Sequence, residues 1–342
     1  ISTQQQGIST QQQGISTQQQ GISTQQQGIS TQQQNISTQQ QNISTQQQGI
    51  STQQQNTSTQ QQNISIQQQN ISTFLVDKQN YDTSKKIYPT IQQAIDNAST
   101  YAVVHVSPGT YNEPIQISHP ITLIGDNCNS IITQTDDSVV TIDSDDVVFM
   151  NFSIIGGDDG IVINDGKNNK IEKNVICRCQ FYGIRSTESN GLLLNRNKIS
   201  ECPNGINLMD GKYITITENE ITMSDDMGIF LQQCNGSRIY GNNIDNAHYG
   251  ITLSKSNGNT IVNNVLDRGN TLLVIDSDSC DNQIAGNDIS NAQYGIYIGD
   301  SSHRNVLGNN NTISEITQCQ LECSLVVPGC GNNTIPSSIR RC

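Results

Sequence analysis

Residues 197–229, NKISECPNGINLMDGKYITITENEITMSDDMGI, contain one pattern twice and decide the fold of this chain. An Asn, a charged residue and an Ile open each copy, at Asn197 and at Asn219. A Gly-Ile pair follows at Gly205 and again at Gly228, so both landmarks return after 22 or 23 residues. Apolar and polar residues alternate between the landmarks, which is typical of short strands with one buried face. The stretch therefore predicts a repeated unit of about three short strands.

Both landmarks continue over much of the chain. The Gly-Ile column has members at Gly160, Gly183, Gly205, Gly228, Gly250 and Gly295, with one Gly missing near Leu272. The Asn column comprises Asn151, Asn174, Asn197, Asn219, Asn242, Asn264 and Asn287. A unit this short cannot bury its own apolar stripe, so we expect successive units to stack as rungs about 4.8 Å apart. Stacking places matching Asn side chains over one another and predicts an Asn ladder.

The pattern resembles the right-handed parallel β-helix repeat family, which includes pectate lyases, polygalacturonases, pectin esterases and many non-enzymatic surface proteins. The resemblance covers roughly residues 87–315. Residues 88–98, YPTIQQAIDNA, and the strand-like residues 103–126 that follow look like the start of pectin-esterase-like β-helices, in which a short helix covers the open end. Pro89 suits a first helical turn, and the apolar stripe of a helix is formed by Ile91, Ala94, Ile95 and Ala98.

These observations predict an all-β fold, a single-stranded right-handed parallel β-helix, with four segments. We expect a heptad-repeat arm at residues 1–73, a linker and capping helix at 74–102, the β-helix at 103–315 and a Cys-rich C-terminal cap at 316–342. The cap breaks the period and contains Cys319, Cys323, Cys330 and Cys342, whose pairing stays open.

Ten cysteines in a chain of this size favour an oxidising compartment. Cys179 and Cys202 each lie five residues after a column Asn, so stacking puts them one rung apart in one column. Their expected Cα separation of about 4.8 Å fits a disulfide. We predict that disulfide, with two reduced thiols in a buried ladder as the alternative. Metal binding is the minor alternative for the cysteines, because Cys177-x-Cys179 matches no common zinc pattern.

Asn-x-Ser/Thr sequons also indicate an extracellular or cell-surface protein. The candidate glycosylation sites are Asn35, Asn42, Asn56, Asn63 and Asn70 in the arm and Asn97, Asn151, Asn235, Asn310 and Asn332 in the body. The net charge of −13 without a basic cluster argues against nucleic acid as a partner. No apolar run approaches the roughly 18 residues of a membrane span.

Carboxylates on adjacent rungs would be needed for acid–base chemistry on a sugar. The candidates are Asp136, Asp137, Asp145, Asp146, Asp158, Asp159, Asp225, Asp226, Asp276, Asp278 and Asp281. Asp159 and Asp226 are expected three rungs apart, about 14 Å, which is too far to share one glycosidic bond.

The catalytic signatures of the resembled families are absent. Neither the paired-Asp and Gly-His-Gly stretches of polygalacturonases nor the Gln-Asp-Thr and Gly-Arg-Pro-Trp stretches of pectin esterases occur. The chain has no Trp, so the aromatic residues available to a sugar are Tyr182, Tyr249 and Tyr294, each just before a Gly-Ile. We therefore assign no catalytic, cofactor or metal site, although an acidic face could hold Ca²⁺ without a linear calcium loop.

The arm repeats the heptad ISTQQQ with Gly or Asn as its seventh residue. Its uncharged, low-complexity composition alone is typical of a disordered tail, but we expect the arm to be ordered in an assembly. The β-branched Ile and Thr and the recurring Gly or Asn argue against a helix and favour an extended run that ends in a bend. If ordered, the arm could wind as extra rungs, since three heptads nearly match one unit, or lie as a strand along neighbouring subunits.

The leading functional hypothesis is a structural subunit of an extracellular, N-glycosylated filament or surface appendage. It would assemble with itself head to tail through the arm and the β-helix. The alternatives are a secreted carbohydrate-active enzyme and a carbohydrate-binding adhesin on the same fold.

Overall fold

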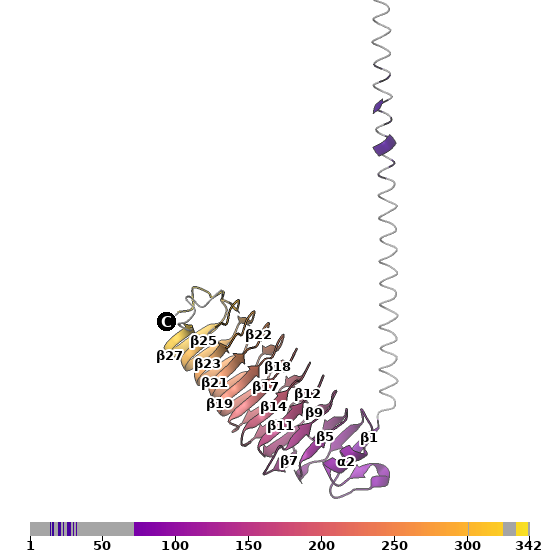
Figure 1. Cartoon of the computed structure of the whole chain (residues 1–342). Coiled ribbons are helices and arrows are strands. Elements are labelled where there is room, and N and C mark those ends of the chain that lie inside the picture. The colour runs from indigo at the N-terminus through magenta and orange to yellow at the C-terminus, as the bar shows by residue number, and fades with distance from the viewer. Residues whose placement is uncertain are drawn as a thin grey trace, which may run out of the picture. The chain divides into compact units, whose positions relative to one another are not determined.

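The computed structural model of the chain describes residues 72–299, 301–323 and 333–340, together with ten positions between residues 14 and 32. The chain divides into two compact units, Ile1–Asn70 and Ile71–Cys342, and each is described by itself. In the second unit, short strands follow one another along a solenoid from β1 to β27 (Figure 1).

The solenoid is built from two parallel sheets. The first sheet has twelve strands, ordered β2 (Ile87–Tyr88), β1 (Thr73–Val76), β3 (Val103–Val106), β6 (Thr122–Ile124), β9 (Val148–Met150), β12 (Lys170–Glu172), β15 (Leu193–Asn195), β18 (Thr215–Thr217), β20 (Arg238–Tyr240), β22 (Thr260–Val262), β24 (Gln283–Ala285) and β26 (Val306–Leu307). Neighbouring strands of this sheet pair in parallel, as stacking of successive turns requires.

The second sheet has two branches that merge into longer strands. One branch contains β4 (Gly109–Asn112), β7 (Ser130–Gln134), β10 (Phe152–Gly156), β13 (Val175–Cys177) and β16 (Lys198–Ser200). The other contains β5 (Ile115–Ile117), β8 (Val140–Ile142), β11 (Asp159–Asn164), β14 (Tyr182–Thr187) and β17 (Asn204–Met209). Both pair with β19 (Glu220–Gln232), which is followed by β21 (Asn243–Ser254), β23 (Val265–Asp276), β25 (Asp288–Ile298) and β27 (Thr312–Cys323). Each middle rung thus has three strand segments, and the predicted parallel β-helix is confirmed.

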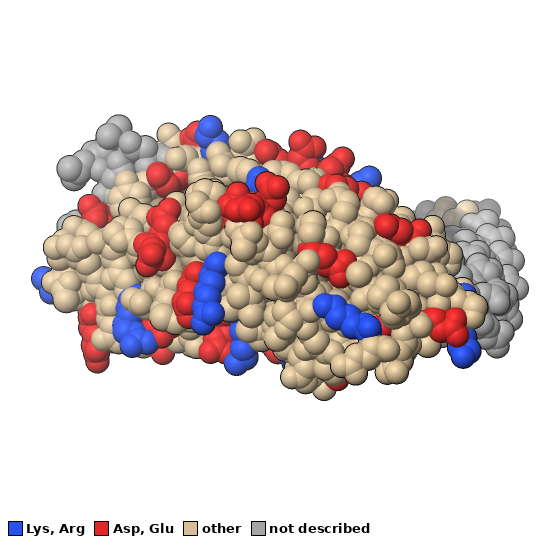
Figure 2. All heavy atoms as spheres, turned by 90° about the horizontal axis from the view of Figure 1, so that it is seen from below, with Lys and Arg blue, Asp and Glu red and all other residues tan. Residues whose placement is uncertain are grey.

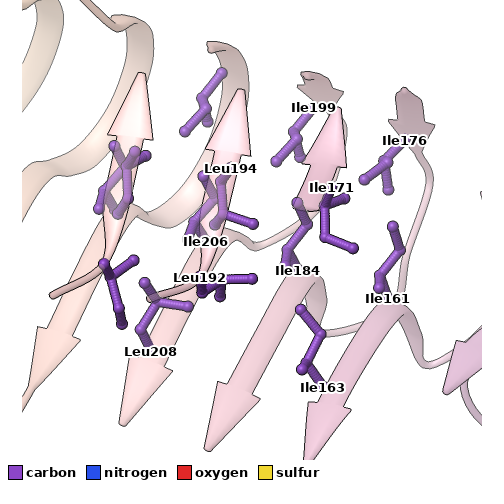
Figure 3. Packing of buried hydrophobic residues seen from close by; sticks show 14 of the residues in the cluster. Ile161, Ile163, Ile171, Ile176, Ile184, Leu192, Leu194, Ile199, Ile206 and Leu208 are labelled. Atoms are coloured by element: carbon purple, nitrogen blue, oxygen red, sulfur yellow. The ribbon is translucent and has the colours of Figure 1, made fainter. Parts of the chain in front are cut away.

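The core is a set of aliphatic columns inside the solenoid. Figure 3 shows Ile and Leu side chains from consecutive rungs directed between the strands. In one column Ile184, Ile206, Ile229 and Ile251 face one another across adjacent strands, and each is fully buried. Each rung covers the apolar stripe of the rung before it, so burial continues along the axis.

The Gly-Ile column marks a close approach between rungs. A Cβ placed on Gly205 would lie 2.6 Å from the carbonyl oxygen of Gly228, and one on Gly183 would lie 2.7 Å from that of Gly205. Any side chain here would push the rungs apart, which explains why Gly recurs before the buried Ile.

The open N-terminal end is covered by a short helix, α2 (Ile91–Asn97), which follows a 3-10 turn, η1 (Thr83–Lys85). The carboxylate of Glu113 accepts hydrogen bonds from the backbone N–H of Ile91 (3.0 Å) and of Gln92 (3.2 Å), which satisfies two free donors of the helix. The cap residue is Thr90, so Pro89 lies before the helix rather than in its first turn as expected.

A ladder of Asn side chains, all buried except the last, runs through the bends before β13, β16, β19, β21, β23, β25 and β27. Nδ2 of Asn197 donates to Oδ1 of Asn219 at 3.0 Å, and the backbone N–H of Asn197 donates to the same oxygen at 2.9 Å. The same pair of bonds joins Asn219 to Asn242. The ladder comprises Asn174, Asn197, Asn219, Asn242, Asn264, Asn287 and Asn311. Each amide therefore satisfies backbone groups that a bend leaves without strand partners.

Asn151 was predicted to belong to this ladder and does not. The register pairs Ser153 with Val175, so Phe152 stands opposite Asn174, and the backbone N–H of Phe152 donates to Oδ1 of Asn174 at 3.0 Å. Asn151 takes a left-handed backbone conformation (φ 67°) one residue earlier. The Asn at residue 151 is thus shifted by one position relative to its column.

A second Asn ladder was missed. It contains Asn259, Asn282 and Asn305, whose backbone N–H groups donate in turn to Oδ1 of Asn282 (2.8 Å), Asn305 (3.0 Å) and Asn333 (2.7 Å). These residues recur every 23 positions, each two residues before an apolar residue, so the same periodicity search could have found them.

Cys179 and Cys202 are stacked where predicted, but the structure contains two free thiols rather than a disulfide. The backbone N–H of Cys179 points at Sγ of Cys202 (3.4 Å), so the sulfur occupies the acceptor position that an Asn oxygen fills in the ladders. Cys319 was predicted to belong to the C-terminal cap but lies on β27, opposite Tyr294, and is disulfide-bonded.

The ten described positions of the arm contradict the argument against a helix. They are helical and exposed: residues 14, 16, 20, 21, 23, 26, 27, 28, 30 and 32. Three Gln residues per heptad have good helix propensity, which outweighs the β-branched and Gly positions here. The rest of the arm lies outside the described residues, as do the predicted rungs or inter-subunit strand.

We predict that Asn242→Ala lowers the free energy of unfolding by about 2–4 kcal/mol, because it leaves several buried backbone and amide groups without partners. Asn243→Ala is the matched control, since Asn243 is exposed on the neighbouring position of β21. We expect this change to alter stability by no more than about 0.5 kcal/mol. Urea denaturation of the two variants measures the difference, and equal stabilities would contradict the role of the ladder.

We also predict that Cys179 and Cys234 resist alkylation in the folded protein at pH 8. The hydrogen bond with Cys202 and burial raise the pKa of Cys179, and burial raises the pKa of Cys234 to about 11. Both thiols therefore stay protonated and covered. Half-buried Cys128 and Cys177 should react first when iodoacetamide labelling is followed by peptide mass spectrometry. A Cys179–Cys202 disulfide in the unreduced peptides would contradict the stacked-thiol arrangement.

Candidate functional site

The outer face of the second sheet carries side chains that the core does not use. The residue directly after each buried Ile of this sheet points outward because strand side chains alternate. The residue just before each Gly-Ile pair is also accessible on most rungs, because the alternation is interrupted at the Gly. The first outward column consists of Asp159, Tyr182, Asn204, Met227, Tyr249, Thr271 and Tyr294. The second outward column consists of Val162, Arg185, Asn207, Phe230, Thr252, Val274 and Tyr297.

The three tyrosines named from the sequence share the first outward column but are not on adjacent rungs. Asn204 and Met227 separate Tyr182 from Tyr249, and Thr271 separates Tyr249 from Tyr294. Two further aromatic residues in the second outward column, Phe230 and Tyr297, were missed. Each directly follows a Gly-Ile pair, so the same alignment could have identified them.

A hollow of about 450 Å³ lies on this face, over β19, β21, β23 and β25. Its ends are formed by Phe230 and Tyr297. Thr252 and Val274, which occupy the two rungs between these rings, form its floor. On its two sides stand Met227, Tyr249 and Thr271 of the first outward column, and Ser254 with Asp276. The hollow arises because two small side chains separate two large ones in a single column.

A second, polar hollow of about 440 Å³ lies beside the corner of the long strands. Its lining includes Ser224, Asn246, His248 and Arg268. The guanidinium of Arg268 is engaged by Asp245, with which it forms two hydrogen bonds, so it is not free for an anion. The His248 and Tyr249 rings meet edge to face at 4.5 Å, and each lines a different hollow.

Asp159 and Arg185 form an ion pair at the start of the outward columns. Oδ2 of Asp159 accepts from Nε of Arg185 and lies near Nη2, both at 2.9 Å, whereas the buried Oδ1 has no hydrogen-bond partner. Burial raises the pKa of Asp159, although Arg185 opposes that shift. The nearest hollow-lining residue of its column, Met227, is three rungs away.

The other acidic candidates do not converge. Oδ1 of Asp145 accepts from the backbone N–H of Lys167 (2.8 Å), and Asp281 pairs with Arg304 (2.7 Å). Asp137, Asp146 and Asp278 take left-handed bend conformations. Of all the candidate carboxylates, Asp276 lines the first hollow and Asp225 the second. Figure 2 shows acidic and basic side chains interspersed over one face of the molecule.

The sequons of the body differ in accessibility. Asn310 is exposed in a turn, and Asn97 is exposed but its Nδ2 donates to the Gln93 carbonyl (2.9 Å). Asn151 and Asn235 are half-buried, and Oδ1 of Asn235 accepts from the backbone N–H of Asn257 at 2.8 Å. Asn332 and the sequons of the arm, Asn35, Asn42, Asn56, Asn63 and Asn70, lie outside the described residues.

Comparison with solved structures identifies the architecture. An alginate lyase from Paenibacillus superimposes with a TM-score of 0.61 at 14% identity, covering 76% of this chain and 99% of that chain. A tailspike protein of bacteriophage CBA120 gives 0.55 at 16% identity, covering 66% and 40%. An exopolygalacturonase from Yersinia enterocolitica gives 0.54 at 11% identity, covering 78% and 79%. Identities this low show the shared right-handed β-helix and no shared activity.

One curated relative is named a cell surface glycoprotein, from Methanothermus fervidus. It is 33% identical over 114 residues, which are 31% of this chain and 19% of that protein. The alignment therefore spans about a fifth of the relative. No helix in the described part of the chain has the length and apolar content needed to cross a membrane.

The family described as periplasmic copper-binding protein (NosD) matches residues 95–276. The described residues do not fit a copper site, because no three His, Cys, Asp or Glu side chains among them are placed to share a metal ion. One pair of such groups does meet: Sγ of Cys280 lies 3.0 Å from Nδ1 of His303, which also contacts the Ser301 carbonyl oxygen at 2.8 Å. Two donors, one of them already engaged, fall short of the soft ligand sets that hold copper.

The matched region begins in the capping helix and runs through the rungs up to β23, so it comprises more than half of the chain. The family and the curated relative are both described as proteins outside the cytoplasm, which gives this chain an extracellular or cell-surface location. By its sequence and its solenoid, the chain belongs to the NosD family of parallel β-helix proteins.

Proposed function

We propose that this protein is a structural subunit of the cell surface, built to span distance rather than to catalyse a reaction. The observation that supports this most is the uninterrupted stacking of the solenoid. The first Asn ladder runs from Asn174 to Asn311, and the aliphatic columns continue beside it. A continuous core with bonded bends gives a stiff rod, which suits a spacer or a filament unit.

We further propose that copies join end to end into an N-glycosylated filament. In the described residues β27 pairs with no strand other than β25, and we propose that its outer edge supplies backbone donors and acceptors to another chain. The opposite end of the solenoid carries α2 and has a different surface. Contact between two unlike ends is heterologous and does not close, so it favours growth into a filament.

The heptad arm is the second element of the proposed contact. Eight heptads offer one Ile among uncharged residues, the heptad at residues 57–63 has Thr instead, and the last heptad has Ile64 and Ile66. A weak apolar contact is thus repeated about every seven residues. Ten such repeats could bind a neighbouring copy cooperatively although each contact is small.

We predict that the full chain forms filaments in negative-stain images at high concentration, whereas a variant lacking residues 1–70 remains monomeric. Sedimentation velocity of both proteins measures assembly, and circular dichroism checks that the β-helix of the variant without the arm stays folded. Filaments of equal length from both proteins would show that the arm does not contribute to the contact between copies. Monodisperse full-length particles at every concentration would contradict the filament itself.

We predict that protein from an N-glycosylating host carries sugar on Asn310 and on the arm sequons Asn35, Asn42, Asn56, Asn63 and Asn70. Asn310→Gln should remove one glycan mass, because its side chain is exposed in a turn. Half-buried Asn151 should stay unmodified. Intact mass before and after enzymatic deglycosylation measures occupancy, and an unmodified chain would refute the glycoprotein proposal.

A carbohydrate-binding role is the second candidate, and the aromatic-walled hollow favours it. An enzymatic role has no comparable support, because the candidate carboxylates do not meet at one place on the outer face.

A further inference from the structure

The hollow over β19 to β25 has the shape of a slot between two rings. Phe230, Thr252, Val274 and Tyr297 occupy one column on four consecutive rungs. Three rung steps separate the Cα atoms of the two aromatic residues by about 14 Å. The two small residues between them recess the surface, which leaves a slot long enough for one or two sugar rings.

The floor of the slot contains an unused hydrogen-bonding group. The side chain of Thr252 is 8% exposed, and its Oγ1 is buried without a hydrogen-bond partner. A buried hydroxyl without a partner destabilises a fold, so such groups call for a specific explanation. A ligand hydroxyl placed in the slot would supply the missing partner.

Asp276 provides a fixed acceptor at the edge of the slot. A Cβ on Gly299 would lie 1.8 Å from Oδ1 of Asp276, so the absence of a side chain at residue 299 lets this carboxylate occupy its position. Ser254 neighbours Asp276 in the same outward column. A carboxylate beside a hydroxyl can accept and donate hydrogen bonds along one edge of a ligand.

We propose that this slot, which we call the Phe230–Tyr297 slot, binds one or two pyranose rings of an uncharged saccharide. Aromatic walls suit the apolar faces of a sugar ring, and the polar rim suits its hydroxyl groups. Among the described residues that line the slot, Asp276 is the one charged residue, and none of them is Lys, Arg or His. An acidic sugar would bring a second negative charge beside Asp276 and would be repelled.

The site lies within one solenoid, so its occupancy does not depend on filament assembly. The probes are the neutral trisaccharides cellotriose, maltotriose and mannotriose and the acidic trigalacturonate, titrated into the full chain by calorimetry. We expect at least one neutral trisaccharide to bind with a Kd of about 1 mM or tighter, and trigalacturonate to bind at least about tenfold more weakly. Asp276→Asn should reduce the difference in Kd between the neutral trisaccharides and trigalacturonate, because it removes the negative charge that repels the acidic sugar.

Tyr297→Ala and Phe230→Ala should each weaken binding about tenfold. The matched control is Tyr294→Ala, which removes the same side chain from the same strand but outside the slot, and should change Kd less than about twofold. Thr252→Val keeps the shape of the floor and removes the hydroxyl. It should weaken sugar binding several-fold without lowering Tm, since the orphaned hydroxyl is removed with it.

Three results would overturn the proposal. The first is no heat of binding from any neutral trisaccharide at about 10 mM, which excludes affinities of biological interest. The second is equal loss of binding in Tyr294→Ala and Tyr297→Ala. The third is binding of trigalacturonate as tightly as the best neutral sugar, which would show that the charge of Asp276 does not select the ligand.

Discussion

The structure depends on vertical register: the backbone of each rung pairs with the next, so residues 22 or 23 positions apart must stack. This constraint turns a one-dimensional repeat into columns with distinct chemistry. Inside the solenoid an Ile column needs only shape. At the bends an Asn column is favoured, because its amide accepts from one rung and donates to the other while both remain buried. On the outer surface, the residues of a column are not constrained by the core or the bends and can be those that bind a ligand or a partner.

The sequence could predict the columns because periodicity reports them directly. The first ladder from Asn174 to Asn287 follows from spacing alone. Asn151 could not be placed, because intervals alternate between 22 and 23 residues and a shift of one position is invisible without the pairing. The stacking of Cys179 on Cys202 was predicted correctly, but the predicted disulfide was wrong, since both thiols are free. Column membership fixes the Cα separation, whereas a disulfide depends on side-chain direction, and here Cys202 accepts from a backbone N–H instead.

The hollow was harder to predict from the sequence than the Asn ladders. Tyr249 could be recognised as an outward aromatic residue, but a recess depends on which residues share its floor and walls. The register between β19 and β21 shifts between Ser224 and Met227, where extra residues are accommodated as a bulge. Because of this shift, Phe230 pairs with Thr252. The one sign of the shift in the sequence is that the spacing between equivalent residues of successive rungs is irregular. For the arm, the prediction against a helix was wrong at the described positions. The β-branched, Gly and Asn residues disfavour a helix, but the Gln residues favour one.

The unsatisfied buried groups are not spread evenly over the described residues. Five residues have such an atom: His119, Asp159, Thr217, Ser224 and Thr252. Three of them, Asp159, Ser224 and Thr252, lie along the second sheet, and two of those line the hollows. The bends a few residues away are bonded through complete ladders, so this fold is able to satisfy its polar groups. Orphaned hydroxyls beside two recesses are therefore best explained by groups that arrive from outside the chain, since local departures from polar satisfaction concentrate where function opposes stability.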